Sequence, residues 1–157
     1  QIRNIKVIGW TTLIFGVVLY ISDKSNINNK LSNNFTYKSA IIIGLLQILS
    51  LIPGVSRSGI SISGARFLRF NRYDSAKIAF LLSIPTLAAV SIYGLNNLIE
   101  SESFELSFLL ISSILLSFVF SFITIKYFLK FVQNFSLNIF VIYRIILGLS
   151  LLVIAYL

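Results

Sequence analysis

The sequence contains no cysteine, no histidine and no methionine among its 157 residues, and only 11% of the residues are charged. Without cysteine the chain forms no disulfide, and without histidine it lacks the side chain that most often acts as an acid or base near neutral pH. Any metal ion would therefore have to be bound by carboxylates. The sequence has five carboxylates, all in polar connections: Asp23, Asp74, Glu100, Glu102 and Glu105.

The lack of methionine also bears on the extent of the chain, because translation begins at methionine. The sequence starts at Gln1, and residues 1–6 lead directly into an apolar segment without a visible signal-peptide cleavage site. We therefore expect residues 1–157 to be a single membrane domain that forms the C-terminal half of a longer protein.

Apolar residues are abundant, making up 57% of the sequence, and the mean hydropathy is +0.92. Four apolar segments are long enough to cross a bilayer as helices: 5–21, 78–95, 106–125 and 137–157. Pro85 lies inside the second of these, which a packed membrane helix tolerates. The composition predicts an all-α integral membrane protein with about four transmembrane helices.

The segment 40–68 is different, because its apolar part, 40–52, is too short at about 1.5 Å per residue to cross a hydrocarbon core of about 30 Å. It ends at a Pro-Gly turn, and a second short segment follows. The segment is therefore either one spanning helix broken in the middle or a re-entrant helix pair that enters the membrane, turns and leaves on the same side.

The basic residues favour the re-entrant pair. With that topology nine of the thirteen lysines and arginines lie on one side, which the positive-inside rule makes cytoplasmic, and the C-terminus faces outward. The nine residues are Lys24, Lys30, Lys38, Arg66, Arg69, Arg72, Lys77, Lys126 and Lys130. Among them, the loop residues Arg66, Arg69, Arg72 and Lys77 indicate membrane topology and contact with anionic lipid, and not binding of nucleic acid.

The turn between the two short segments carries a polar motif, LIPGVSRSGISISG, over residues 51–64. If Ser56 begins a helix, the unpaired N–H groups of its first turn and the helix dipole form an anion site. Arg57 would add a bidentate donor suited to phosphate, with Ser58 and Ser61 close by on the same helix. Spacing alone equally fits a structural turn with packing serines and an arginine that extends to the headgroups.

Three pieces of the sequence resemble one family. PGVSRSG at 53–59, SISGARFLRFNRYDSAKIAFLLSIP at 61–85 and FVIYRIILG at 140–148 are similar to the undecaprenyl-diphosphatase family, the bacitracin-resistance (BacA/UppP) membrane phosphatases. The family signature is PGxSRSG followed after one residue by threonine. Ser61 stands at the threonine position and keeps the hydroxyl group.

The resemblance implies an inverted-repeat fold in which each half has a re-entrant helix pair and the two tips meet around a polar site. It also implies that the complete enzyme hydrolyses undecaprenyl diphosphate to undecaprenyl phosphate and inorganic phosphate in the bacterial inner membrane, recycling the lipid carrier for cell-wall synthesis. Family members carry glutamates and a histidine in their first half, which have no counterpart here. The chain alone is therefore expected to be inactive.

The resemblance assigns roles to five residues. Arg57 would neutralise phosphate oxygens in the transition state, with Ser56 and Ser58 as further catalytic donors. Gly54, Ser58 and Ser61 would bind substrate. No metal ligand is expected within this chain, and a divalent cation such as Mg²⁺ is expected only by analogy with the family. The expected partners are a polyprenyl diphosphate and membrane lipids, with a homo-oligomer left open.

Two other functions compete with hydrolysis. Discontinuous helices that meet inside the membrane are also typical of transporters, so the protein could move a phosphorylated lipid or another anion. A half-length structural subunit is the third hypothesis.

Three other polar residues lie in apolar segments. For Arg144, packing or extension to the headgroups is favoured over a place in the site. For Gln47 and Ser50, a structural role is favoured.

Overall fold

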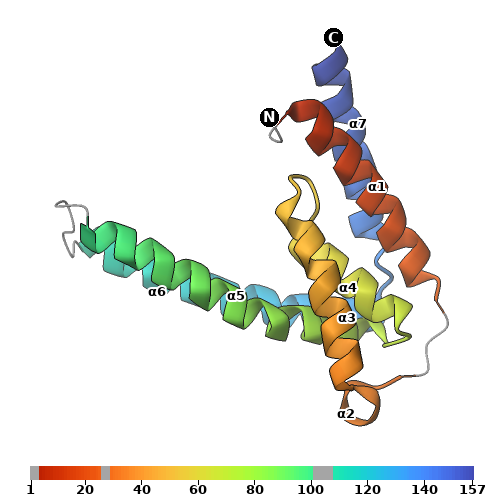
Figure 1. Cartoon of the computed structure of the whole chain (residues 1–157), viewed down its shortest axis with the longest axis horizontal. Helices are drawn as coiled ribbons and strands as arrows, with labels where there is room; N and C mark the ends of the chain where they lie inside the picture. The colour runs from red at the N-terminus through yellow and green to blue at the C-terminus, as the bar shows by residue number, and fades with distance from the viewer. Residues whose placement is uncertain (1–3, 26–28, 101–107) are drawn as a thin grey trace.

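The computed structural model describes residues 4–25, 29–100 and 108–157, and these residues form helices with one isolated bridge between Asn29 and Phe70 (Figure 1). Four of the helices, α1, α5, α6 and α7, are long and apolar enough to cross a membrane. The prediction of an all-α membrane protein is confirmed. The elements are α1 (Ile5–Asp23), α2 (Leu31–Asn34), α3 (Tyr37–Ile48), the 3₁₀ turn η1 (Leu49–Leu51), α4 (Arg57–Phe67), α5 (Arg72–Glu100), α6 (Phe108–Asn134) and α7 (Asn138–Tyr156).

The helices extend beyond the apolar segments that predicted them. The segment 78–95 lies inside α5, which begins at Arg72 and continues through Pro85, and α6 runs past the segment 106–125 to Asn134. Residue 106 lies outside the described residues. Hydropathy detects only the apolar part of a helix, whereas the backbone hydrogen bonds continue into polar turns at its ends.

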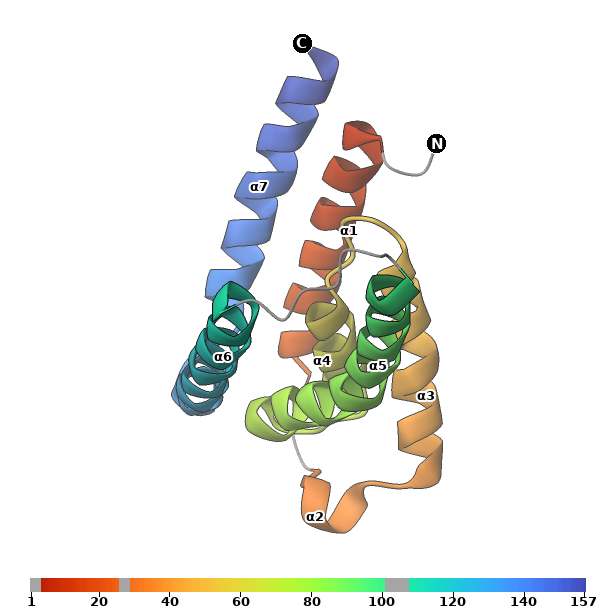
Figure 2. The same ribbon diagram turned by 90° about the vertical axis from the view of Figure 1, so that its left-hand side faces the viewer.

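Helices α1 and α7 pack against each other in antiparallel directions (Figures 1 and 2). Lys6 at the start of α1 lies over the Tyr156 ring at the end of α7, with its Nζ atom 4.2 Å from the ring centroid. The backbones approach closely at Gly148, where a Cβ atom would lie 2.6 Å from Leu13 Cγ. Small residues at a helix crossing allow the close packing that holds helices together in lipid.

Helices α3 and α4 form the predicted hairpin, and its two ends lie at the same end of the molecule. The Asn29 N–H before α3 donates to the Arg69 carbonyl after α4, with an N···O distance of 3.0 Å. The Leu31 N–H donates to the Asp74 carboxylate at the start of α5, also at 3.0 Å. The chain therefore enters and leaves the hairpin on one side, which is the geometry of the re-entrant pair.

The tip of the hairpin rests on α1. The Thr11 hydroxyl donates to the Pro53 carbonyl at 2.6 Å, and the Thr12 hydroxyl lies 3.5 Å from the Gly54 carbonyl oxygen. Gly54 has φ +90°, a conformation that favours glycine. Because both threonines lie within α1, a membrane that α1 spans places the tip at depth.

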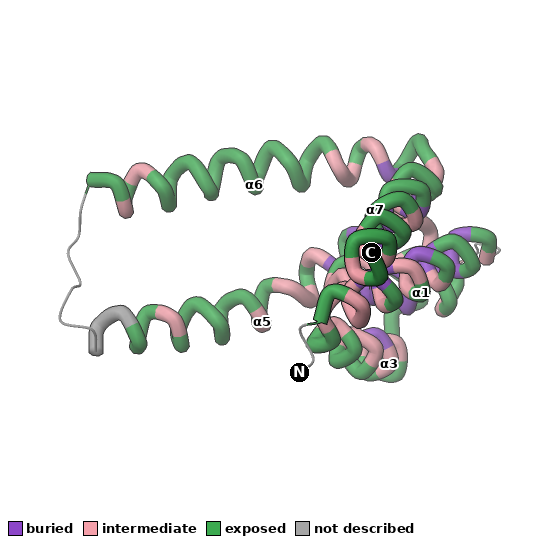
Figure 3. The backbone as a smooth tube through the Cα atoms, turned by 90° about the horizontal axis from the view of Figure 1, so that it is seen from above, coloured by how far each residue is buried: buried purple, intermediate pink, exposed green. Residues whose placement is uncertain are grey.

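The α5–α6 hairpin extends away from the other helices, and most of its surface is exposed (Figure 3). Among the residues described, its base contributes to the core, where Ala76, Ala79 and Val132 pack with Leu19 and Val141. Apolar surface on this scale needs lipid or further protein to cover it.

Candidate functional site

Helix α4 begins directly after Ser56, the serine that the sequence predicted to open it. Ser56 has extended backbone angles, and its hydroxyl accepts the Gly59 N–H at 3.1 Å, which is the N-cap arrangement. Its Oγ atom also lies 3.2 Å from Ser58 Oγ. Within the described residues, the backbone N–H groups of Arg57 and Ser58 have no hydrogen-bond acceptor. Two hydroxyl groups and two unpaired N–H groups therefore surround the positive end of the α4 dipole.

A cavity of about 140 Å³ opens beside this helix start. Ser56, Ser58 and Gly59 form one wall, and apolar side chains from α1, α4, α6 and α7 form most of the rest. The remaining polar side chain in the lining is Arg144 of α7. The polar atoms of the motif thus face a small, mainly apolar space, in which electrostatic interactions are strong.

Arg144 is buried in this cavity, with only 9% of its surface exposed. A Cβ atom at Gly59 would lie 3.1 Å from Arg144 Nη2, so the guanidinium group reaches the first turn of α4. It has no hydrogen bond or ion pair among the described residues. The sequence favoured packing or extension to the headgroups for Arg144 over a place in the candidate site, and the structure buries Arg144 in the cavity beside the start of α4. An arginine within an apolar span, without a nearby acid, was the available indication.

Arg57 is half-buried and does not line the cavity. It has no hydrogen bond or ion pair with any described residue. Because Arg57 and Ser58 are adjacent on a helix, their side chains point in directions about 100° apart. The structure therefore brings Ser56 and Ser58 together with Arg144 and leaves the Arg57 guanidinium outside the cavity, next to the same helix start.

Ser61 lies deeper in α4 and faces α3. Its hydroxyl is buried and lies 3.4 Å from Gln47 Oε1, while Gln47 Nε2 lies 3.2 Å from Thr86 Oγ1 on α5. These contacts link α3, α4 and α5, in agreement with the structural role favoured for Gln47. Substrate contacts of Ser61 and of Gly54, whose carbonyl faces Thr12, stay predictions.

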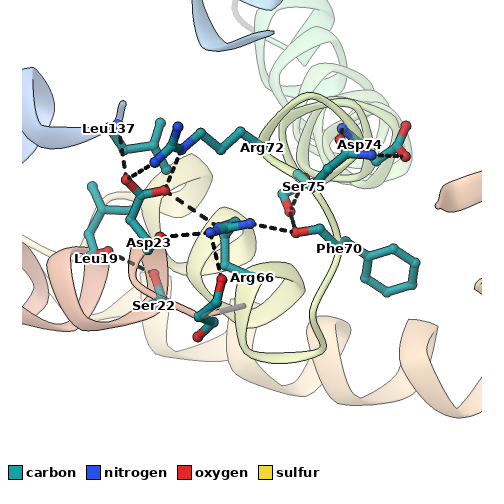
Figure 4. Close-up of polar contacts among 11 residues, drawn as sticks. Leu19, Ser22, Asp23, Arg66, Phe70, Arg72, Asp74, Ser75 and Leu137 are labelled. Carbon is teal, nitrogen blue, oxygen red and sulfur yellow. Dashed lines mark hydrogen bonds and ion pairs between the residues drawn. The ribbon is translucent and has the colours of Figure 1, made fainter. Parts of the chain in front are cut away.

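A buried ionic cluster fixes the opposite end of α4 (Figure 4). The Asp23 carboxylate accepts two hydrogen bonds from Arg72, at 2.7 and 3.0 Å, and a third from the Leu137 N–H at 3.3 Å. Arg66 is fully buried, and its Nε atom lies 3.5 Å from the same carboxylate. Burial lowers the pKa of Arg66, and Asp23 opposes that shift. The cluster connects α1, α4, α5 and α7.

Arg66 is further held by three backbone carbonyl groups, those of Phe70, Asp23 and Ser25, at 2.9, 2.7 and 3.1 Å. The sequence placed Asp23 in a polar connection and gave it no role. Its partners lie far away in the sequence, so only the fold reveals the cluster.

The described residues do not supply a metal site. No group of three or more carboxylates lies together among them, and Asp23 and Asp74 already accept hydrogen bonds from the protein. The donor atoms around the cavity are hydroxyl, N–H and guanidinium groups, which suit an anion and not a cation. The donors around this cavity therefore do not form a Mg²⁺ site, and the divalent cation expected by family analogy stays a prediction.

These features define a multi-pass helical membrane protein in which hydroxyl, N–H and guanidinium groups lie together at the start of α4. A family model described as "Bacitracin resistance protein BacA" matches residues 1–150, and the chain belongs to this family.

Curated relatives named undecaprenyl-diphosphatase support the assignment. The chain is 56% identical over 154 residues to the protein of Pelagibacter ubique and 40% identical over 156 residues to that of Jannaschia sp.. These matches include 98% and 99% of this chain but only 60% and 58% of the relatives. A Campylobacter curvus relative is 46% identical over 147 residues, 93% of this chain and 55% of its own length. The chain thus spans less than two thirds of the length of these relatives.

Proposed function

We propose that the full-length protein hydrolyses undecaprenyl diphosphate to undecaprenyl phosphate and inorganic phosphate in the bacterial inner membrane. The names of the similar proteins and the family membership support this activity. The single observation that carries it is the start of α4, where hydroxyl, N–H and guanidinium groups converge beside a small cavity. A diphosphate on a lipid tail needs such a cationic site within reach of the bilayer.

In the reaction, a water oxygen bonds to the terminal phosphorus, and the bond from that phosphorus to the bridging oxygen breaks. The bridging oxygen leaves with the lipid monophosphate, and the water protons pass to a base and to the products. Arg57 neutralises the phosphate oxygens, while Ser56, Ser58 and the first N–H groups of α4 donate hydrogen bonds to them. The described residues near the cavity contain no carboxylate or histidine, so the base belongs to a part of the protein outside them.

The proposal includes a divalent cation only as a group bound by the substrate phosphates and by residues outside those described. Such a cation would neutralise the charge of the diphosphate. Chelation by EDTA tests this point, because a required cation makes the activity fall on chelation and return when Mg²⁺ is added.

The test is phosphate release from undecaprenyl diphosphate by the purified full-length protein in detergent. We expect release by the wild type, loss of at least 100-fold in Arg57→Ala because a phosphate contact in the transition state is removed, and no release by residues 1–157 alone. Lys130→Ala, which removes one exposed positive charge from α6, is the matched control and should retain activity.

Failure of the wild type to release phosphate would refute hydrolysis. Uptake of the same lipid into vesicles, without cleavage, would then establish the transport hypothesis.

A further inference from the structure

We propose that Arg144 is a second phosphate-binding residue, whose guanidinium group binds an anionic oxygen of the ligand held at the start of α4. The identity of the ligand as a lipid diphosphate rests on the function proposed above. The inference itself concerns an anion subsite formed by Ser56, Ser58, Gly59 and Arg144, distinct from the side of α4 on which Arg57 lies.

The first observation is geometric. Arg144 Nη2 would lie 3.1 Å from a Cβ atom at Gly59, so a glycine at this position leaves the guanidinium group room against the first turn of the helix. The Arg144 Cβ atom itself lies 3.3 Å from where a Cβ atom would stand on Gly16 of α1. The close α1–α7 crossing therefore sets the position from which Arg144 reaches α4.

The second observation is the contrast between two buried arginines of the same chain. Arg66 donates to three carbonyl oxygens and lies beside Asp23, so its charge is compensated. Arg144 is 9% exposed and has no hydrogen bond or ion pair among the described residues. Burying an uncompensated charge costs several kcal/mol, which a bound anion would offset.

The third observation is the sign of the surrounding charge. The first turn of α4 carries the positive end of the helix dipole, and Arg57 adds a full positive charge beside it. The carboxylates whose side chains are described, Asp23 and Asp74, contact residues at the other end of α4 and at the start of α5. Two guanidinium groups flanking a helix N-terminus match a ligand with several negative charges, such as a diphosphate.

The test compares Arg144→Gln and Arg144→Lys with the wild type and with Lys130→Gln, an exposed charge-removing control, all in the full-length protein. Binding is measured as the rise in the thermal midpoint on adding undecaprenyl diphosphate in micelles, with undecaprenol as the ligand that lacks phosphate. We expect the diphosphate, but not undecaprenol, to stabilise the wild type. We also expect kcat/KM to fall about 10- to 100-fold in Arg144→Gln, with partial recovery in Arg144→Lys.

A purely structural role gives a different pattern, in which the midpoint without ligand falls but the diphosphate still raises it by the wild-type amount. That result, or unchanged kcat/KM in Arg144→Gln, would overturn the inference while leaving hydrolysis intact. Stabilisation that depends on Arg144, without any phosphate release by the wild type, would support the subsite and refute the hydrolase. If Arg144→Gln does not fold, the same two measurements are made on Arg144→Lys, because lysine keeps the charge but lacks the planar pair of donors. A wild-type rise in the midpoint together with an unchanged kcat/KM in Arg144→Lys would then overturn the inference.

Discussion

Replacing Gly54 by alanine tests how the hairpin tip positions the site. Gly54 has φ +90°, and an added Cβ atom would overlap Thr11 Oγ1 and lie 2.7 Å from the Ile8 carbonyl oxygen. It would also lie 3.1 Å from Thr12 Oγ1. A hydroxyl group can rotate away from such a contact, but the Ile8 oxygen belongs to the backbone of α1 and cannot.

The expected cost has two parts. An L-residue in the left-handed region costs about 1–2 kcal/mol, and forcing an extra methyl group into a packed contact costs about 1–3 kcal/mol. Together they predict a loss of about 2–5 kcal/mol in the free energy of unfolding. The least costly relief is movement of the tip away from α1, which breaks the Thr11 hydrogen bond to the Pro53 carbonyl and displaces Ser56.

In the first assay the full-length protein is heated in detergent, and chromatography measures the fraction that remains folded at each temperature. The second assay measures phosphate release. We expect Gly54→Ala to lower both the midpoint and the activity. Gly44→Ala is the matched control, because Gly44 lies in α3 with no atom within 4 Å of its added Cβ, and alanine is favoured over glycine in a helix by about 0.5–1 kcal/mol. Equal midpoints and activities for Gly54→Ala and the wild type would refute the docking of the tip on α1.

Two further predictions concern the contacts that hold the helices together. Asp23→Asn should lower the free energy of unfolding by about 3–5 kcal/mol, because it leaves Arg66 buried without its carboxylate partner, and equal thermal midpoints for variant and wild type would contradict this. Gly148→Leu should separate α1 from α7, because even a Cβ atom there would lie 2.6 Å from Leu13. The separation is measured as loss of a cysteine crosslink between positions 6 and 156 introduced into the otherwise identical protein, and a crosslink of wild-type yield would refute it.

Local sequence features predicted the hairpin and its helix start well. Pro53 and Gly54 mark a turn through fixed and left-handed backbone angles, and Ser56 caps α4 through its own hydroxyl group. The loop charges favoured a hairpin whose two ends lie on the same side, and the contacts of Asn29 and Leu31 bring those ends together. Each of these properties depends on a few neighbouring residues, so a single sequence is enough to find them.

The contacts that complete the site lie beyond such local rules. Asp23 accepts a hydrogen bond from the Leu137 N–H, 114 residues away in the sequence, and Arg144 reaches α4 from a position on α7 where that helix packs closely against Gly16 of α1. Neither partner can be read from spacing within one helix. Two glycines permit the crossing, Gly9 and Gly148. Hydropathy does not distinguish them from the other residues of the apolar segments in which they lie.

The charges along α4 connect these observations. At its C-terminal end Arg66 is buried, and the protein supplies both a carboxylate and three carbonyl oxygens to compensate it. At its N-terminal end, about 16 Å away for an 11-residue helix, the described residues provide Arg57, Arg144 and the helix dipole but no negative group. Arg66 thus has compensating groups within the protein, whereas Arg144 has none among the described residues, and the proposed anion would compensate Arg144. The Arg144 variants therefore measure whether that anion is a phosphate.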